Sequence, residues 1–230
     1  WTTTPDNILF EVITDIPFDF HVIDLEHSSL TEFQCENLIR LANLKNKNCL
    51  IRLTSNKDDQ IKKVLDSGAN GLILPNIKSN NEFNEILKFI YYPPKGGRWV
   101  GLTRASGFGK NFSDYFKKIN DKLSIFVIIE NKEILGNIEA VMKNKNIDAF
   151  MIGPYDLSSS LGIPGELSHK LFKDTIKKIL DMTKKYNKKI GIHLVEPDPI
   201  ELKKLIKKFD FVIYSTDIIV LKRNLENIFR

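Results

Sequence analysis

The stretch AFMIGPYDLSSSLG, residues 149–162, leads from a short apolar run into a polar segment that carries an acid. Residues 149–152 have the length and composition of a buried strand, which Gly153 and Pro154 end. Asp156 is therefore expected just beyond the carboxyl end of a strand. In barrels of alternating strands and helices, functional side chains occupy that position.

Two earlier segments repeat this pattern. The apolar residues 124–129 run into Glu130, and residues 21–25 run into Glu26 and His27. All strands of a parallel barrel end at one face, so these side chains are expected to converge there. The pattern predicts an α/β protein with a functional site at the carboxyl ends of its strands.

Short apolar runs alternate with amphipathic stretches along the chain. We predict strands at residues 21–24, 49–53, 71–74, 99–101, 125–129, 149–152, 189–193 and 211–214, with a fragment of a strand at 1–4. We predict helices around residues 7–14, 30–43, 58–67, 80–91, 112–120, 132–143, 169–187, 199–207 and 217–228.

The predicted strands are continuously apolar, as expected when helices cover both faces of a parallel sheet. With the fragment at residues 1–4 there are nine candidate strands, of which residues 99–101 are the least convincing. The remaining eight fit a (β/α)8 TIM barrel of the α/β class, in a single domain of residues 1–230, whose first strand we expect to be truncated. An open, doubly wound sheet is the alternative, less favoured because no Gly-x-Gly-x-x-Gly motif follows the early strands.

The composition is that of an ordinary globular protein, with 42% hydrophobic and 27% charged residues, and no apolar run approaches the roughly 20 residues that span a membrane. The net charge of +5 comes mostly from lysines on predicted helix faces, which favours a solvated surface over a nucleic-acid site. The chain shows no signal peptide, and its two cysteines lack metal or redox spacing. We therefore expect a cytoplasmic protein.

Glu130 and Asp156 are the candidate metal ligands, because each follows an apolar strand at the same predicted end of the sheet. Two carboxylates that leave open positions for water and ligand suit Mg²⁺ or Mn²⁺. The alternative for either acid alone is a cap on the helix that follows it.

His27 is the candidate general base, because imidazole commonly moves protons near neutral pH. Asp66 ends a predicted helix; it would orient the imidazole if it reached His27, and is otherwise a solvated acid. Arg52 ends an apolar strand, where an unpaired guanidinium is costly. We expect it to meet an anion, either Glu26 or the carboxylate of a ligand.

The segment after Gly153 is a candidate anion site, since the amides of Tyr155 and Asp156 open a helix-like turn. Two further residues are candidates for a supporting role next to the residues that would contact the metal and substrate. His193 ends a predicted strand, and Arg104 lies in a loop, where a surface salt bridge is its alternative role.

Several motifs occur in order from Phe18 to about Asp217. They are Phe18-Asp19-Phe20, Asp24-Leu25-Glu26-His27, Ile51-Arg52, residues 64–71 (VLDSGANG), Tyr92-Pro93-Pro94, Gly97-Arg98, Ile129-Glu130, Gly153-Pro154-Tyr155-Asp156-Leu157 and Leu161-Gly162. Together they resemble the HpcH/HpaI aldolase family, the class II pyruvate-dependent aldolases of the phosphoenolpyruvate/pyruvate barrel superfamily.

The resemblance implies a modified (β/α)8 barrel, usually a hexamer, that cleaves 4-hydroxy-2-oxo acids to pyruvate and an aldehyde or runs the reverse condensation. The implied partners are thus a 2-oxo acid, an aldehyde and further copies of the chain. By the family's motifs, Glu130 and Asp156 would hold a divalent metal, Mg²⁺ or Mn²⁺. Arg52 would contact the pyruvyl oxygen.

The resemblance also implies the remaining roles. His27 paired with Asp66 would handle protons, and the amides of Tyr155 and Asp156, after Gly153, would seat the substrate carboxylate. A metal and a guanidinium would stabilise the charge of a pyruvate enolate, so no lysine Schiff base is required.

The chain departs from the family's pattern in three places. Ile128 stands where a Gln commonly precedes the metal-binding Glu by two positions, His193 stands where an apolar residue is expected, and the loop around Arg104 is shorter. Trp1 aligns with a family tryptophan near the substrate site. These departures bear on substrate identity more than on reaction type.

Two other functions stay open at this point. A related lyase that cuts acyl-CoA thioesters, such as malyl or citramalyl compounds, would keep the barrel but need a groove for the CoA arm. A barrel that binds a metal and an oxo acid without turnover is the non-enzymatic alternative, and Ile128 is its motivation.

Overall fold

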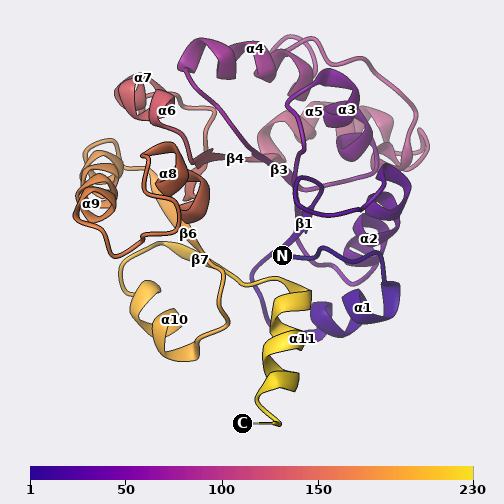
Figure 1. Cartoon of the computed structure of the whole chain (residues 1–230). Helices are drawn as coiled ribbons and strands as arrows, with labels where there is room; N and C mark the ends of the chain where they lie inside the picture. The colour runs from indigo at the N-terminus through magenta and orange to yellow at the C-terminus, as the bar shows by residue number, and fades with distance from the viewer. Residues whose placement is uncertain (230) are drawn as a thin grey trace. The chain divides into compact units, whose positions relative to one another are not determined.

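The computed structural model describes residues 1–229, in which seven strands alternate with helices (Figure 1). The order of the strands in the sheet is their order along the chain. They are β1 (His21–Asp24), β2 (Cys49–Arg52), β3 (Gly71–Leu74), β4 (Ser124–Ile129), β5 (Ala149–Ile152), β6 (Lys189–Leu194) and β7 (Phe211–Tyr214).

Helices follow or precede every strand. They are α1 (Asn7–Asp15), α2 (Glu32–Leu44), α3 (Asp58–Asp66), α4 (Asn80–Ile90), α5 (Phe112–Lys122), α6 (Lys132–Gly136), α7 (Ile138–Met142), α8 (Pro154–Ser160), α9 (Lys170–Lys185), α10 (Pro199–Leu205) and α11 (Asp217–Glu226), with a 3-10 turn, η1 (Arg104–Ser106). Polar residues begin many of them. At α2, for example, Thr31 and Gln34 form a capping box, which satisfies amides that the first helical turn leaves unpaired.

The described chain divides by its contacts into two compact units. The first contains residues 1–73 and 84–124, and the second contains residues 74–83 and the chain from 125 onward. In the first unit β1 pairs in parallel with β2, with His21 opposite Cys49, and β2 pairs in parallel with β3, with Leu50 opposite Gly71. Each of these strands is buried along its whole length, as predicted for a sheet covered on both faces.

The strand fragment predicted at residues 1–4 is represented by one bridge. Thr2 lies in a parallel bridge with Ile23; its amide donates to the Val22 carbonyl at 2.7 Å, and its carbonyl accepts from the Asp24 amide at 3.0 Å. The predicted strand fragment at residues 1–4 therefore pairs with β1.

In the second unit four strands pair in parallel, with Val127 of β4 opposite Phe150 of β5. Ile152 of β5 lies opposite Ile192 of β6, and β6 pairs with β7. Phe150 and Ile152 are fully buried, so these strands form the core of the unit.

Seven of the predicted strands are confirmed to within one residue at each end. The strand predicted at residues 99–101 is wrong, because this segment is irregular and the Trp99 side chain is 78% exposed. An apolar run flanked by glycines predicts a buried strand. In the structure, however, both Trp99 and Val100 are exposed. The helix predicted at 132–143 is interrupted at Asn137, and α8 was not predicted as a helix.

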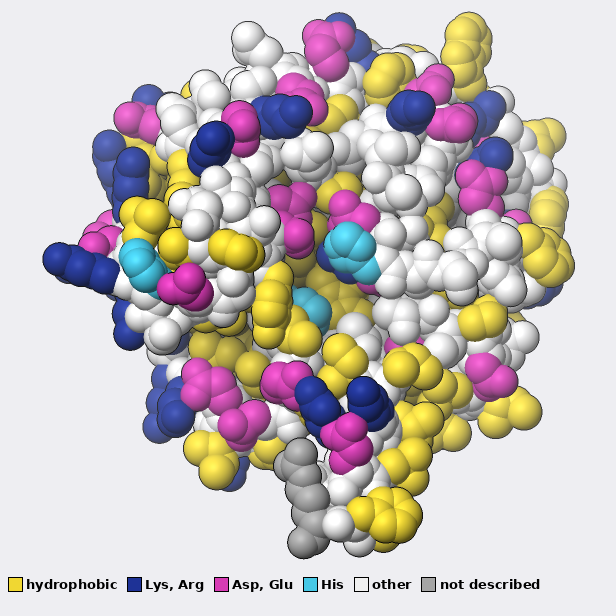
Figure 2. Space-filling view, viewed as in Figure 1, with side chains coloured by type: hydrophobic (Ala, Val, Ile, Leu, Met, Phe, Trp, Pro, Cys, Tyr) yellow, Lys and Arg dark blue, Asp and Glu magenta, His cyan; other side chains and the backbone are white. Residues whose placement is uncertain are grey.

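The fold class is therefore α/β with a seven-stranded parallel sheet. No helix among the residues described is long and apolar enough to cross a membrane. On the face shown in Figure 2, Lys and Arg side chains are interspersed with Asp and Glu rather than gathered into one patch. The absence of a nucleic-acid partner, the cytoplasmic location and the single domain stay predictions.

Candidate functional site

Glu130 lies at the carboxyl end of β4, in the second unit. The apolar strand ends at Ile129, which lies opposite Ile152 of β5, so Glu130 follows at the same edge as Gly153. Glu130 is only 8% exposed, and its Oε1 accepts a hydrogen bond of 2.5 Å from the Asn76 amide. A buried carboxylate is stable only when it has such partners.

Asp156 lies in the first turn of α8, which starts immediately after β5. Gly153 is the N-cap without a side-chain cap, and Pro154 occupies the first turn. The amides of Tyr155 and Asp156 belong to the first turn, where the helix itself supplies no acceptor. Both side chains are exposed. The second unit therefore brings the two predicted metal ligands to the ends of adjacent strands.

Gly153 leaves room for the Glu130 carboxylate. A Cβ at position 153 would lie 3.4 Å from Glu130 Oε2, 3.3 Å from Glu130 Cβ and 3.2 Å from Ile128 Cγ2. Glu130 Oε1 therefore contacts the Asn76 amide, and Oε2 lies beside Gly153, at the junction of β5 and α8. Ile128, two residues before Glu130, is fully buried and makes the wall beside Gly153 apolar.

This donor set fits a divalent metal. Two carboxylates at neighbouring strand ends provide the hard oxygen donors that Mg²⁺ and Mn²⁺ prefer. In the part of the chain that the structure describes, no group of three or more His, Cys, Asp or Glu side chains could hold a metal. A catalytic metal ion held by two carboxylates keeps coordination positions open for water and substrate.

Arg52 lies at the carboxyl end of β2, in the first unit, and its guanidinium is buried. Its Nε donates to Asp24 Oδ1 at 2.7 Å, a second nitrogen donates to Asp24 Oδ2 at 2.5 Å, and a third lies 3.4 Å from Glu26 Oε2. The guanidinium also stacks on the Trp1 ring, 4.2 Å from its centroid. The expectation that Arg52 meets Glu26 is confirmed, although its principal partner, Asp24, was not predicted.

The pKa of Asp24 reflects two opposing effects. Burial alone would raise the pKa, but the hydrogen bonds and positive charge of Arg52, with the amides of His27 and Glu26, lower it below its ordinary value. Asp24 therefore stays ionised and holds the Arg52 guanidinium in place.

His27 follows β1, and its side chain is 61% exposed. Its amide donates to Asp24 Oδ1 at 3.3 Å, and its Nε2 lies 3.9 Å from Glu26 Oε2. An exposed imidazole at the carboxyl end of a strand is free to meet a substrate.

The structure does not pair His27 with Asp66. Asp66 ends α3, which leads into the amino end of β3, whereas His27 follows the carboxyl end of β1. Because these strands are parallel, the two side chains belong to opposite ends of the sheet. Asp66 instead forms an ion pair with Arg98.

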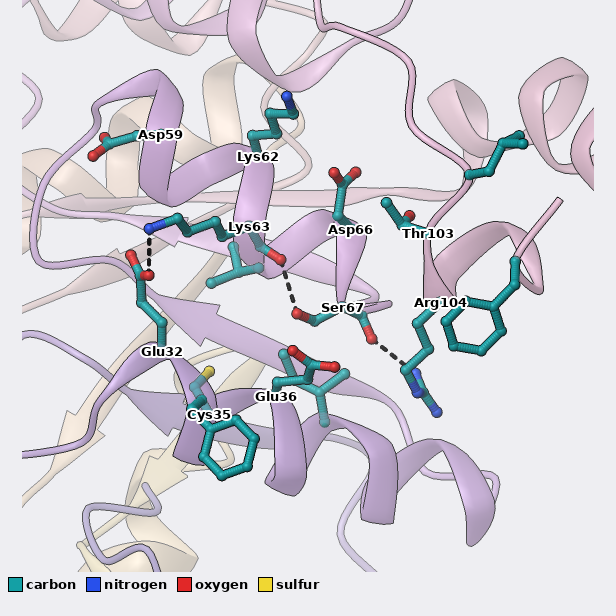
Figure 3. Close-up of a pocket in the computed structure, with 15 residues that line it drawn as sticks. Glu32, Cys35, Glu36, Asp59, Lys62, Lys63, Asp66, Ser67, Thr103 and Arg104 are labelled. Carbon is teal, nitrogen blue, oxygen red and sulfur yellow. Dashed lines mark hydrogen bonds and ion pairs between the residues drawn. The ribbon is translucent and has the colours of Figure 1, made fainter.

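Asp66 also lines a pocket of about 670 Å³ in the first unit, between α2, α3 and the η1 segment (Figure 3). Arg104 borders the same pocket and donates to the Ser67 carbonyl at 2.7 Å and to Asn43 Oδ1 at 2.6 Å. Arg104 therefore fastens the η1 segment to α2 and α3, and forms no surface salt bridge among the described residues. His193 lies half-buried in β6, opposite Ile213.

Residues 1–210 match the model of the HpcH/HpaI aldolase/citrate lyase family. The chain belongs to this family. It is 30% identical over 96% of its length to a hydroxypyruvate/pyruvate aldolase of Roseobacter denitrificans, of which it covers 86%. It is 28% identical over 98% of its length to a 2-keto-3-deoxy-L-rhamnonate aldolase of Klebsiella pneumoniae, of which it covers 85%.

The fold agrees with that of a solved family member. A HpcH/HpaI aldolase/citrate lyase family protein of Burkholderia cenocepacia J2315 superposes with a TM-score of 0.93 at 22% identity, covering 100% of this chain and 91% of the other. Family membership and the names of the relatives confirm the predicted resemblance and the prediction of a carbon–carbon lyase of the aldolase type.

Proposed function

We propose that this HpcH/HpaI family member is a metal-dependent aldolase that cleaves a 4-hydroxy-2-oxo acid to pyruvate and an aldehyde, or forms it from them. The observation that carries the proposal is the placement of Glu130 and of the segment from Gly153 to Asp156 at adjacent strand ends in the second unit. The aldolase names of the relatives support the same reaction.

Glu130 and Asp156 would hold the metal, Mg²⁺ or Mn²⁺. When bound, this ion polarises the 2-oxo group and stabilises negative charge on its oxygen. The amides of Tyr155 and Asp156 are assigned to the substrate carboxylate, because the start of a helix without a side-chain cap favours an anion.

In the cleavage direction, His27 is assigned to accept the proton of the 4-hydroxyl group. The C4 oxygen then forms the aldehyde carbonyl as the C3–C4 bond breaks, and the bonding electrons pass into the enolate of pyruvate. Arg52 is assigned to stabilise the enolate oxygen, and its contacts with Asp24 and Glu26 support this role because they fix the guanidinium. A proton added at C3 then completes pyruvate.

Within one chain Asp66 forms an ion pair with Arg98. Its assignment to proton transfer with His27 stays a prediction. The proposal retains four finer predictions: a closed eight-stranded barrel, a single domain, a homo-oligomer such as a hexamer, and a cytoplasmic location. The likeness to a solved family member over the whole chain supports the barrel.

The test is an aldol assay with pyruvate and a series of hydroxyaldehydes, in which pyruvate consumption is followed with Mn²⁺, with Mg²⁺ and after chelation. We expect turnover that requires the metal and is lost in Glu130→Ala. No turnover with any aldehyde, or full activity of Glu130→Ala, would contradict the proposal.

A further inference from the structure

The loop between β3 and α4 makes a direct contact with the candidate metal ligand Glu130. Asn76 lies in this loop with a φ of 51°, in the left-handed region. Residues other than glycine rarely adopt this conformation, although Asn tolerates it better than most. In this conformation the Asn76 amide donates to Glu130 Oε1 at 2.5 Å.

A second asparagine, Asn131, forms hydrogen bonds with this loop. The Asn131 side chain is buried, and its Nδ2 donates to Asn76 Oδ1 at 3.3 Å and to the Ile77 carbonyl at 3.2 Å. Its Oδ1 accepts the Ile134 amide at 2.9 Å and so caps α6. The amide group of Asn131 thus joins the loop after β3 to the helix that follows Glu130, and every residue in this network belongs to the second unit.

The two carboxylate oxygens of Glu130 lie beside different residues. Oε1 is occupied by the Asn76 amide, and Oε2 lies where a Cβ on Gly153 would be 3.4 Å away. A free carboxylate rotates about its last bond, and a hydrogen bond to one oxygen stops this rotation. Oε2 is therefore held beside Gly153, at the junction of β5 and α8.

We propose that Asn76 is a positioning residue for metal binding, which holds Glu130 through its left-handed backbone amide, with Asn131 fixing the loop. The inference rests on the proposed function, in which Glu130 is a metal ligand. Hydrogen bonds that orient a ligand commonly change metal affinity by roughly 10- to 100-fold. The left-handed backbone at residue 76 is the feature on which the positioning depends.

The test replaces Asn76 with Val, whose branched side chain strongly disfavours a positive φ and so moves the amide. Asn187 provides the matched control, because it is also an asparagine of the second unit with a φ of 51° but is exposed in the turn before β6. Binding of Mn²⁺ is measured from the electron paramagnetic resonance signal of the free ion, and folding is measured by thermal melting.

We expect Asn76→Val to raise the Kd for Mn²⁺ about tenfold or more, and Asn187→Val to leave it unchanged while lowering the melting temperature to a similar degree. Asn131→Ser is a second variant, because serine keeps the cap on α6 but removes both donations to the loop. Asn131→Ser should also raise the Kd for Mn²⁺. If Asn76→Val does not fold, the Kd of Asn131→Ser tests the positioning role by itself.

The outcomes separate the two hypotheses. If the wild-type protein binds Mn²⁺ and the folded Asn76→Val and Asn131→Ser variants bind it equally tightly, the positioning role is overturned and the aldolase proposal stands. If the wild-type protein binds no Mn²⁺ in this assay, or if Glu130→Gln binds it as tightly as wild type, the metal assignment itself is overturned, and the role of Asn76 with it.

Discussion

At the scale of single residues, Arg52 shows what a sequence can and cannot predict. A guanidinium at the end of an apolar strand must meet an anion, and that much followed from the sequence. The choice of Asp24 did not, because it depends on the parallel register that sets Asp24 opposite Arg52. The one hint in the sequence was that Asp24 and Arg52 are both the last residue of their strands.

The pair of Asp24 with Arg52 carries a prediction about stability and pH. Removing one partner of a buried ion pair leaves an uncompensated charge, so Asp24→Asn should lower the free energy of unfolding by about 3–5 kcal/mol at pH 7. The pKa of Asp24 is lowered from its ordinary value of 3.8, so this stabilisation is complete well above pH 4 and is lost as the pH falls through the folded-state pKa.

Urea unfolding of the two proteins at pH 7 and pH 3 measures this difference, which should shrink at pH 3. Asp15→Asn is the control, because Asp15 forms an exposed ion pair with Lys45 at 2.7 Å, and such pairs contribute about 1 kcal/mol or less. Equal losses from Asp24→Asn and Asp15→Asn would show that the buried pair has no special role.

At the scale of secondary-structure elements, the strands were predictable because continuous apolar runs of this length leave few alternatives. The short helix α8 was not, since Pro154 and Gly153 indicate a turn as readily as a helix start. The segment at residues 99–101 misled the prediction because exposed apolar side chains resemble a strand when only the sequence is known.

The junction of β5 and α8 carries a second prediction, in which Gly153→Ala lowers Mn²⁺ affinity and aldol activity about tenfold. The added methyl group would lie 3.2 Å from Ile128 Cγ2 and 3.3 Å from Glu130 Cβ, which is tighter than ordinary contact, so Glu130 and its carboxylate would have to shift. The φ of −90° at Gly153 is open to alanine, so folding should be preserved.

Gly136→Ala is the control for this prediction, because a Cβ there meets nothing within 4 Å. Calorimetric titration with Mn²⁺ and thermal melting distinguish the two glycines. An unchanged Mn²⁺ affinity in Gly153→Ala would mean that the space beside Glu130 does not serve the metal.

At the scale of the whole molecule, the sequence predicted the α/β class, the family and the two strand-end acids. It could not reveal the ion pair of Asp66 with Arg98, because distance along the chain does not reveal at which end of the sheet a helix terminus lies. Once α3 is seen to end before β3 begins, Asp66 belongs with Arg98 and the pocket between α2 and α3. The contribution of Asn76 was invisible for a similar reason, since only the structure reveals its positive φ.

The most direct measurement of the central claim is the exchange of the pyruvate methyl protons in deuterated water, followed by proton NMR with Mg²⁺ present. If Glu130 and Asp156 hold the ion over which an oxo acid forms its enolate, the wild-type protein should exchange these protons. Exchange should then fall at least about 100-fold in Glu130→Gln and in Asp156→Asn. Exchange at the wild-type rate in both variants would contradict the account.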